Sequence, residues 1–198
     1  MATNPWLTPV AEPDAPAQST DEPEKPHATG ARWPEPGLRA VDTVDRLPRR
    51  DVPTGSGLWV LGVHGGAGET SLATWLEGAS ECGHAWPIQD GQPARVLLVA
   101  RTHAAGLEAA RRAATEWGGA TVPVGVQGLV LLGDAPGALP HLLRAQVRQL
   151  SGAVPATWAL PYCPSMRLAA TVPPEPPPPV ARVLRAISRS IITTEGTS

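Results

Sequence analysis

Three continuous apolar runs constrain the fold of this chain more than any other feature of its sequence. They lie at residues 57–63, 94–101 and 126–133. Segments with helical periodicity follow the runs, at residues 70–79, 103–117 and 139–150, and a short fourth strand is predicted at 157–162. Continuous apolar strands that alternate with amphipathic helices are typical of a parallel sheet covered on both faces. The sequence therefore predicts an α/β fold: a three-layer sandwich with a mainly parallel sheet of four or five strands.

The ends and faces of the predicted helices follow from local signals. Thr102 is the expected N-cap of the second helix, and Gly118 and Gly119 are expected to end it. The apolar residues of the third helix are expected to face the core; they are Leu139, Leu142, Leu143, Val147 and Leu150. Residues 80–93 show neither period and are predicted to form a loop.

The folded domain is predicted to occupy only residues 54–172. Residues 1–53 hold ten prolines, nine acidic and six basic residues, so they cannot bury enough apolar area to offset their ordering entropy, and a disordered arm is predicted. Trp6 and Trp33 stand out in this arm; they are either chance occurrences or short motifs that dock on a partner or on the domain. Residues 173–198 combine a proline-rich spacer with an amphipathic helix at 180–192.

Charge and composition exclude several classes of protein. A net charge of −2 gives no reason to expect direct nucleic-acid binding. Cys82 and Cys163 make no disulfide framework, which favours a reducing, cytoplasmic compartment. No signal peptide is recognisable, and no apolar stretch reaches the roughly 18 residues of a membrane span. All basic residues but Lys25 are arginines and phenylalanine is absent, which is typical of a GC-rich genome such as that of an actinobacterium.

A glycine-rich segment between the first strand and the first helix is the most informative part of the sequence. It runs from Gly62 to Ser71 and reads GVHGGAGETS. Glycines in such a position let the backbone curl so that its N–H groups point at phosphate oxygens. A lysine then bridges the phosphates, and a serine or threonine binds Mg²⁺. The segment is therefore a candidate phosphate loop, comprising His64, Gly65, Gly66, Ala67, Gly68, Glu69, Thr70 and Ser71.

This loop resembles the variant phosphate loop of the ParA/MinD ATPases, K-G-G-x-G-K-[ST]. The positions that match are Gly65, Gly66, Gly68 and Thr70. His64 stands where the family has its signature lysine, and Glu69 stands where it has the P-loop lysine. The resemblance implies a P-loop NTPase-like domain with a degenerate nucleotide site. The alternative is an ordinary glycine-rich turn in an unrelated α/β domain.

The two substitutions decide what the loop can bind. Two unit charges about 4 Å apart interact by about 4 kcal/mol at an effective dielectric of about 20, so exchanging lysine for Glu69 costs several kcal/mol per phosphate charge. Lys25 lies in the arm and cannot compensate, whereas Arg101 at a strand end could do so if a loop placed it there. The sequence thus predicts no cofactor, or weak binding of ATP and Mg²⁺ if Glu69 turns outward. His64 adds positive charge only below a pKa of about 6.5.

Asp134 admits two alignments with the same family. In one, it follows the strand 126–133 as the acid on the Mg²⁺ side of the site. In the other, residues 96–114 match the later strand and helix of the family, the middle of the family fold is missing, and Asp134 is a loop residue. The shortness of the folded part favours the second alignment.

Other groups of reactive residues are too sparse to indicate a site. Cys82 and His84 are two possible zinc ligands where zinc needs three or four, so no metal site is predicted. The helix at 180–192 has an aliphatic side opposite Arg182, Arg185 and Arg189. Such a helix either packs on the sheet, which its lack of aromatic residues favours, or binds a membrane surface.

The predicted function is that of a pseudo-ATPase that does not hydrolyse nucleotide and acts as a regulatory or scaffolding partner. The resemblance implies a ParA-like or transfer ATPase, or a second copy of the chain, as the partner, in DNA segregation or conjugative transfer. Two alternatives stay open. One is a divergent ATPase completed by a residue of its partner, and the other is an interaction module that recruits through Trp6 and Trp33.

Overall fold

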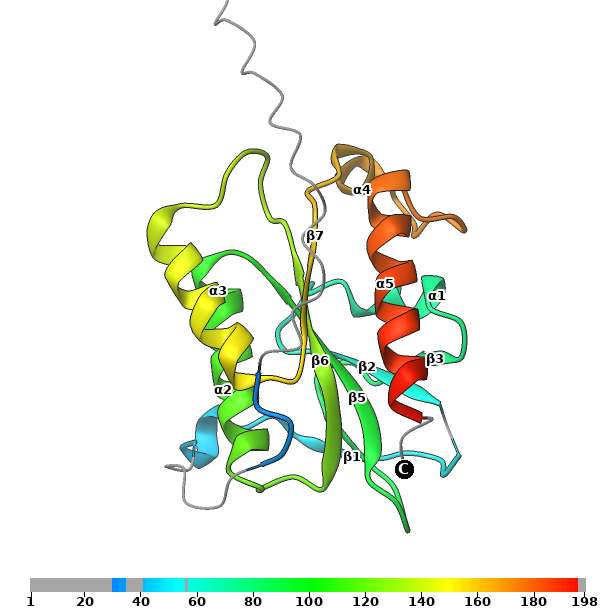
Figure 1. Ribbon diagram of the computed structural model, residues 1–198. Helices are drawn as coiled ribbons and strands as arrows, with labels where there is room; N and C mark the ends of the chain where they lie inside the picture. The colour runs from blue at the N-terminus through cyan, green and yellow to red at the C-terminus, as the bar shows by residue number, and fades with distance from the viewer. Residues whose placement is uncertain (1–29, 35–40, 56, 196–198) are drawn as a thin grey trace, which may run out of the picture.

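The computed structural model describes residues 30–34, 41–55 and 57–195 (Figure 1). Its main sheet has five parallel strands in the order β3-β2-β5-β6-β7. The strands are β2 (Leu58–Gly62), β3 (Ala79–Glu81), β5 (Ala94–Arg101), β6 (Val124–Leu132) and β7 (Thr157–Leu160). The predicted α/β fold with a mainly parallel sheet is therefore confirmed.

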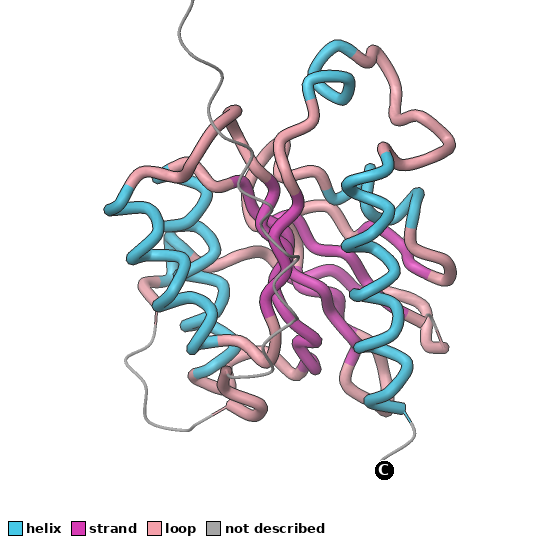
Figure 2. The backbone as a smooth tube through the Cα atoms, turned by 45° about the horizontal axis from the view of Figure 1, so that its top comes forward, coloured by secondary structure: helices cyan, strands magenta, loops and turns pink. Residues whose placement is uncertain are grey.

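Helices cover both faces of this sheet, giving three layers (Figures 1 and 2). On one face lie α2 (Ala104–Gly118) and α3 (His141–Ala153), and on the other lie α1 (Glu69–Trp75) and α5 (Pro178–Glu195). A short helix, α4 (Pro164–Leu168), follows β7. Each face has its own hydrophobic cluster, because residues of β2 and β5 alternate between the two: Leu61 and Leu98 face α2, whereas Val60 and Leu97 face α1 and α5.

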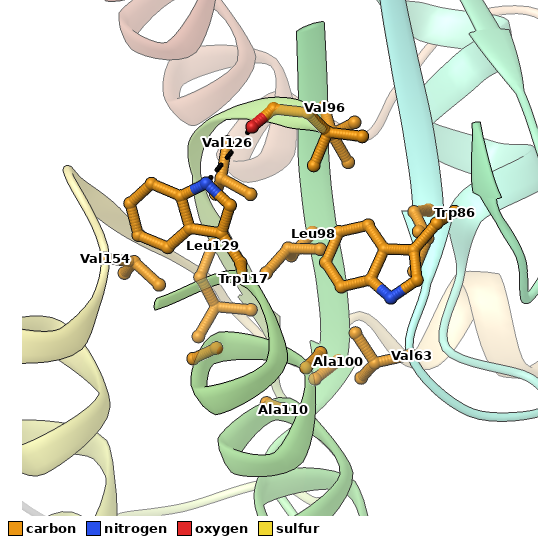
Figure 3. Close-up of a cluster of buried hydrophobic side chains, with 14 of the residues drawn as sticks. Val63, Trp86, Val96, Leu98, Ala100, Ala110, Trp117, Val126, Leu129 and Val154 are labelled. Carbon is orange, nitrogen blue, oxygen red and sulfur yellow. Dashed lines mark hydrogen bonds between the residues drawn. The ribbon is translucent and has the colours of Figure 1, made fainter. Parts of the chain in front are cut away.

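Tryptophans fill the core of a chain that has no phenylalanine. Trp86 and Trp117 are almost fully buried on the α2 side, Trp86 near Val63 and Trp117 near Leu129 (Figure 3). The indole N–H of Trp117 donates to the carbonyl of Val124 over 3.2 Å. The buried indole thereby satisfies its polar group and ties the end of α2 to the start of β6.

Part of the segment predicted as a disordered arm is ordered. A 3₁₀ helix spans Thr43–Asp45, and β1 (Arg49–Asp51) pairs in parallel with β4 (Trp86–Ile88) as a second, two-stranded sheet. The prediction for 1–53 is thus wrong over 41–53, because β4 supplies the pairing that the local composition cannot reveal. Trp6 lies outside the described residues, and Trp33 is 79% exposed.

The loop predicted at 80–93 contains β4 and the end of β3, so that prediction was incomplete. Both strands have three residues, which is too short for a period to be visible. The N-cap of α2 is His103, whose ring nitrogen accepts from the N–H of Gly106, instead of the predicted Thr102. The first helix ends at Trp75, earlier than predicted.

The predicted inner face of α3 is partly confirmed. Leu150 is buried, and Leu143 and Val147 pack partly buried against the core, but Leu142 is 77% exposed. Leu139 lies before the helix and is half-buried. The neighbour that α3 packs against is α2. A helix that packs on another helix at the margin of the sandwich buries a narrower stripe than one lying across the sheet.

The last helix, α5, packs on the sheet as part of the core. Val180, Leu184, Ile187 and Ile191 of α5 are buried against β7 and its neighbours, as the packing alternative requires. The guanidinium of Arg95 donates to the carbonyl of Ile191 over 3.1 Å. Within the described residues, no helix is long and apolar enough to cross a membrane.

Candidate functional site

The glycine-rich loop lies at the point where the sheet changes direction. From β2 the chain passes through α1 to β3 on one side, and it then returns to form β5 on the other side of β2. The carboxyl ends of β2 and β5 therefore diverge into loops that leave on opposite faces. Ligands of open α/β sheets bind in the crevice at this switch point. The loop 63–68 and the residues after Arg101 meet there.

The loop backbone is curled in the way its glycines predict. Gly66 and Gly68 have φ angles of 71° and 107°, which residues with a Cβ rarely adopt. A Cβ on Gly68 would lie 2.5 Å from Leu132 Cδ2. Ala67 is fully buried between them, and its N–H donates to the carbonyl of His64 over 3.2 Å. Packing on β6 as well as backbone conformation thus requires glycine at position 68.

The Glu69 side chain turns inward, onto the loop. Its carboxylate accepts from the N–H of Gly68 over 3.0 Å, and the side chain is 13% exposed. A Cβ on Gly62 would lie 2.6 Å from Glu69 Oε2, so the carboxylate rests against the end of β2. The N–H of Gly68 in this loop therefore has the protein's own carboxylate as its acceptor. The outward position on which weak ATP binding depended is not the one observed.

His84 completes the surroundings of Glu69. Its Nε2 lies 3.5 Å from Glu69 Oε1, and its Nδ1 lies 2.7 Å from the carbonyl oxygen of Gly62. With Nδ1 donating to that carbonyl, the ring orients Nε2 toward the carboxylate. The sequence suggested His84 only as a zinc ligand beside Cys82, but the structure gives it a different role, as a neighbour of Glu69. Among the described residues there is no group of three His, Cys, Asp or Glu side chains that could hold a metal ion.

Arg101 supplies the positive charge at the loop. Its Nε donates to the carbonyl of Gly66 over 2.8 Å, and its Nη1 lies 3.8 Å from Asp134 Oδ1. The backbone N–H of Asp134 donates to Thr102 Oγ1 over 3.1 Å, which fixes the start of the loop after β6. Asp134 is therefore an ion-pair partner of Arg101 at the edge of the sheet. Arg101 ends β5, the strand beside β2, and Asp134 follows β6, the next strand of the sheet.

His64 is held as a neutral ring. Its Nδ1 lies 2.9 Å from the carbonyl of Gly65, and its Nε2 accepts from the N–H of Arg101 over 3.1 Å. Burial, the largest cause, lowers the pKa of His64 from 6.5, and the nearby His103, with ring centres 5.2 Å apart, lowers it further. Its contacts tie the loop to β5, and as a neutral ring it adds no positive charge to the loop.

Of the last two loop residues, only Ser71 lines a cavity. Thr70 is exposed, and its carbonyl accepts from the hydroxyl of Thr74 over 2.8 Å. Ser71 is half-buried and borders a cavity of about 160 Å³ together with Gly68 and Arg101. This cavity extends from the loop toward β7, α4 and α5. The cavity could not be predicted from the sequence, because its walls run from Gly68 to Val180, more than a hundred residues apart.

Comparison with known proteins assigns the chain to a family. A family model described as "Family of unknown function (DUF6668)" matches residues 56–184, which include the loop and the whole five-stranded sheet. Neither a curated protein nor a solved structure matches the chain. Because the family model covers more than half of its length, the chain belongs to the DUF6668 family.

Proposed function

We propose that this chain is a P-loop pseudo-ATPase that does not hydrolyse nucleotide and acts in the cytoplasm as a regulatory or scaffolding partner of another protein. The observation that carries the proposal is the inward carboxylate of Glu69. It accepts from the N–H of Gly68 and rests against Gly62 inside the curled loop. A loop that already binds an internal anion has little capacity for a second one.

Electrostatics supports the same conclusion. A phosphate placed about 4 Å from the Glu69 carboxylate would be repelled by about 4 kcal/mol per unit charge at an effective dielectric of about 20. Arg101 offsets part of this repulsion, but its guanidinium also faces the carboxylate of Asp134. Lys25, the single lysine of the chain, lies outside the described residues. The basic groups beside the loop therefore do not match the charge of a nucleoside triphosphate.

The identity of the partner rests on fewer observations than the loss of nucleotide binding. The ParA/MinD resemblance of the loop points to a ParA-like or transfer ATPase, or to a second copy of this chain, and to DNA segregation or conjugative transfer as the process. Four large apolar side chains are exposed among the described residues, namely those of Trp33, Val44, Leu142 and Leu168. They are the first positions to vary when partner contacts are mapped. A chain that associates neither with itself nor with such an ATPase in sedimentation and pull-down experiments would not be a scaffold of this kind.

The experiment is a titration of the full chain with a fluorescent ATP analogue and Mg²⁺, beside Glu69→Lys and Glu69→Gln. We expect no saturable binding by the wild type, and binding by Glu69→Lys, because the lysine replaces a repulsive charge by an attractive one. Glu69→Gln separates loss of repulsion from gain of attraction. Micromolar binding by the wild type would contradict the proposal.

A specific observation favours a second candidate, a divergent ATPase completed by a partner. Arg101 is bonded to the loop carbonyl of Gly66, so a cation is already present where a phosphate would lie. This candidate predicts ATP turnover that appears only when the partner is added and that Arg101→Gln abolishes.

A further inference from the structure

We propose that the cavity beside the loop binds a small organic anion, a phosphate or carboxylate compound, through Arg101 and Arg167. The cavity has a volume of about 160 Å³ and lies at the carboxyl edge of β5, β6 and β7, under α4. Its lining residues are Gly68, Ser71, Trp75, Arg101, Leu132, Gly133, Leu160, Tyr162, Cys163, Met166, Arg167 and Val180. This inference goes beyond the proposed function: the cavity shares Gly68, Ser71 and Arg101 with the loop site, but it extends to Arg167 and needs no nucleotide in the loop.

The charge of the lining selects an anion. Both charged residues that line the cavity are arginines, and no acidic residue is among the lining residues that the structure describes. Arg167 forms no ion pair within the described ranges, so its charge is available. Arg101 is partly neutralised by Asp134 at 3.8 Å, which lies outside the lining. Burial raises the pKa of the Cys163 thiol, so at neutral pH the thiol adds no negative charge.

The uncharged polar groups of the lining offer further donors. Within the described part of the chain, the hydroxyls of Ser71 and Tyr162 have no hydrogen-bond partner. The indole N–H of Trp75, in contrast, is already bonded to the carbonyl of Pro173 over 2.8 Å. Two free hydroxyls and two guanidinium groups around one cavity suit a ligand rich in acceptor oxygens. Arginine is well matched to phosphate and carboxylate because it can donate two parallel hydrogen bonds.

The size of the cavity limits the ligand. Pockets for drug-sized ligands have volumes of about 300–1,000 Å³, so this cavity is too small for a nucleoside triphosphate. Apolar walls from Trp75, Leu160 and Val180 leave space for a short hydrocarbon part beside the charged group. The class of ligand is therefore a small organic phosphate or carboxylate, and the two sources are separated by experiment.

The test is calorimetric titration of the full chain with inorganic phosphate and, separately, with butyrate at constant ionic strength. We expect saturable binding of at least one probe, and the probe that binds identifies the charged group. Arg167→Gln should weaken this binding about tenfold or more, because a hydrogen-bonded charge is lost. Arg185→Gln is the matched control, since it removes an equal charge from the exposed side of α5, away from the cavity. Tyr162→Phe should weaken binding by a smaller factor.

A second measurement locates the ligand. Cys163 lines the cavity, whereas Cys82 is fully buried with its pKa raised to about 12 by burial, so iodoacetamide should alkylate Cys163 first. A saturating concentration of the bound probe should slow this alkylation several-fold. The inference is overturned if neither probe saturates, if Arg167→Gln and Arg185→Gln weaken binding equally, or if a bound probe leaves the alkylation rate of Cys163 unchanged.

Discussion

At the scale of single residues, Gly106 determines how closely α2 can approach the loop. A Cβ at this position would lie 2.4 Å from the carbonyl oxygen of Arg101 and 2.9 Å from His64 Nε2. The first is backbone at the end of β5, and the second is fixed by its bond to the N–H of Arg101. Neither can yield without disturbing the contact between His64 and β5. The glycine is therefore required by close approach, in a helix where alanine would otherwise be preferred.

Gly106→Ala should consequently lower the free energy of unfolding by about 1–3 kcal/mol, since overpacking outweighs the gain in helix propensity. Gly152→Ala is the matched control, because Gly152 is also helical and a Cβ there would meet nothing within 4 Å. It should stabilise the protein by up to about 1 kcal/mol. Urea denaturation of both variants measures the difference, and equal effects would contradict this account of Gly106.

The environment of His64 predicts a dependence of stability on pH. Burial holds the pKa of folded His64 below the 6.5 of the free side chain, so the unfolded chain binds a proton first as the pH falls. The contribution of His64 is thus fully present above about pH 6.5, decreases below it, and levels off once the pH is below the folded pKa. Denaturation midpoints between pH 7.5 and 5 should fall less steeply for His64→Gln than for the wild type. His141→Gln, at an exposed position, should keep the wild-type slope.

At the scale of elements, a helix or strand could be predicted from the sequence where its own residues determine it, and not where a distant segment does. The strand 94–101 was predicted with the bounds of β5, because its buried run is continuous and ends at charged residues. The inner face of α3 was predicted only in part, because Leu142 is apolar but exposed on a helix that packs on α2. The strands β1 and β4 were missed since each has only three residues and pairs with a strand from a distant part of the chain.

The candidate site, too, could be predicted only in part. The curl at Gly66 and Gly68 followed from the glycine spacing, because backbone conformation is a local property. The inward turn of Glu69, in contrast, depends on Gly62 and His84, and the position of Arg101 depends on the register of β5 beside β2. Contacts of this kind are set by the assembled sheet, and a single sequence does not reveal them.

The packing of α5 leads to a prediction at this scale. Ile187 is fully buried in the cluster that α5 forms with β7 and β2. Ile187→Ala should lower the free energy of unfolding by about 2–5 kcal/mol, as expected for a truncated core aliphatic residue. Arg182→Ala, on the exposed side of the same helix, should change it by less than about 0.5 kcal/mol. If both variants were equally mild in a urea titration, the helix would not be part of the core.

At the scale of the whole molecule, the two layers of helices differ in where their helices lie in the chain. The α2 and α3 layer is made of helices that directly connect neighbouring strands, β5 to β6 and β6 to β7 (Figure 1). Most of the opposite layer comes from α5, which follows the last strand and the segment that carries α4. The face formed by Val60, Leu97 and Val130 depends on it for cover.

This arrangement has a consequence for synthesis on the ribosome. All five strands precede α5 in the chain and leave the ribosome before it, and without α5 one apolar face of the sheet has only the short α1 over it. Incomplete chains with such a surface tend to aggregate or to be held by chaperones. A chain that ends before α5 would therefore leave the apolar face formed by Val60, Leu97 and Val130 largely open to water.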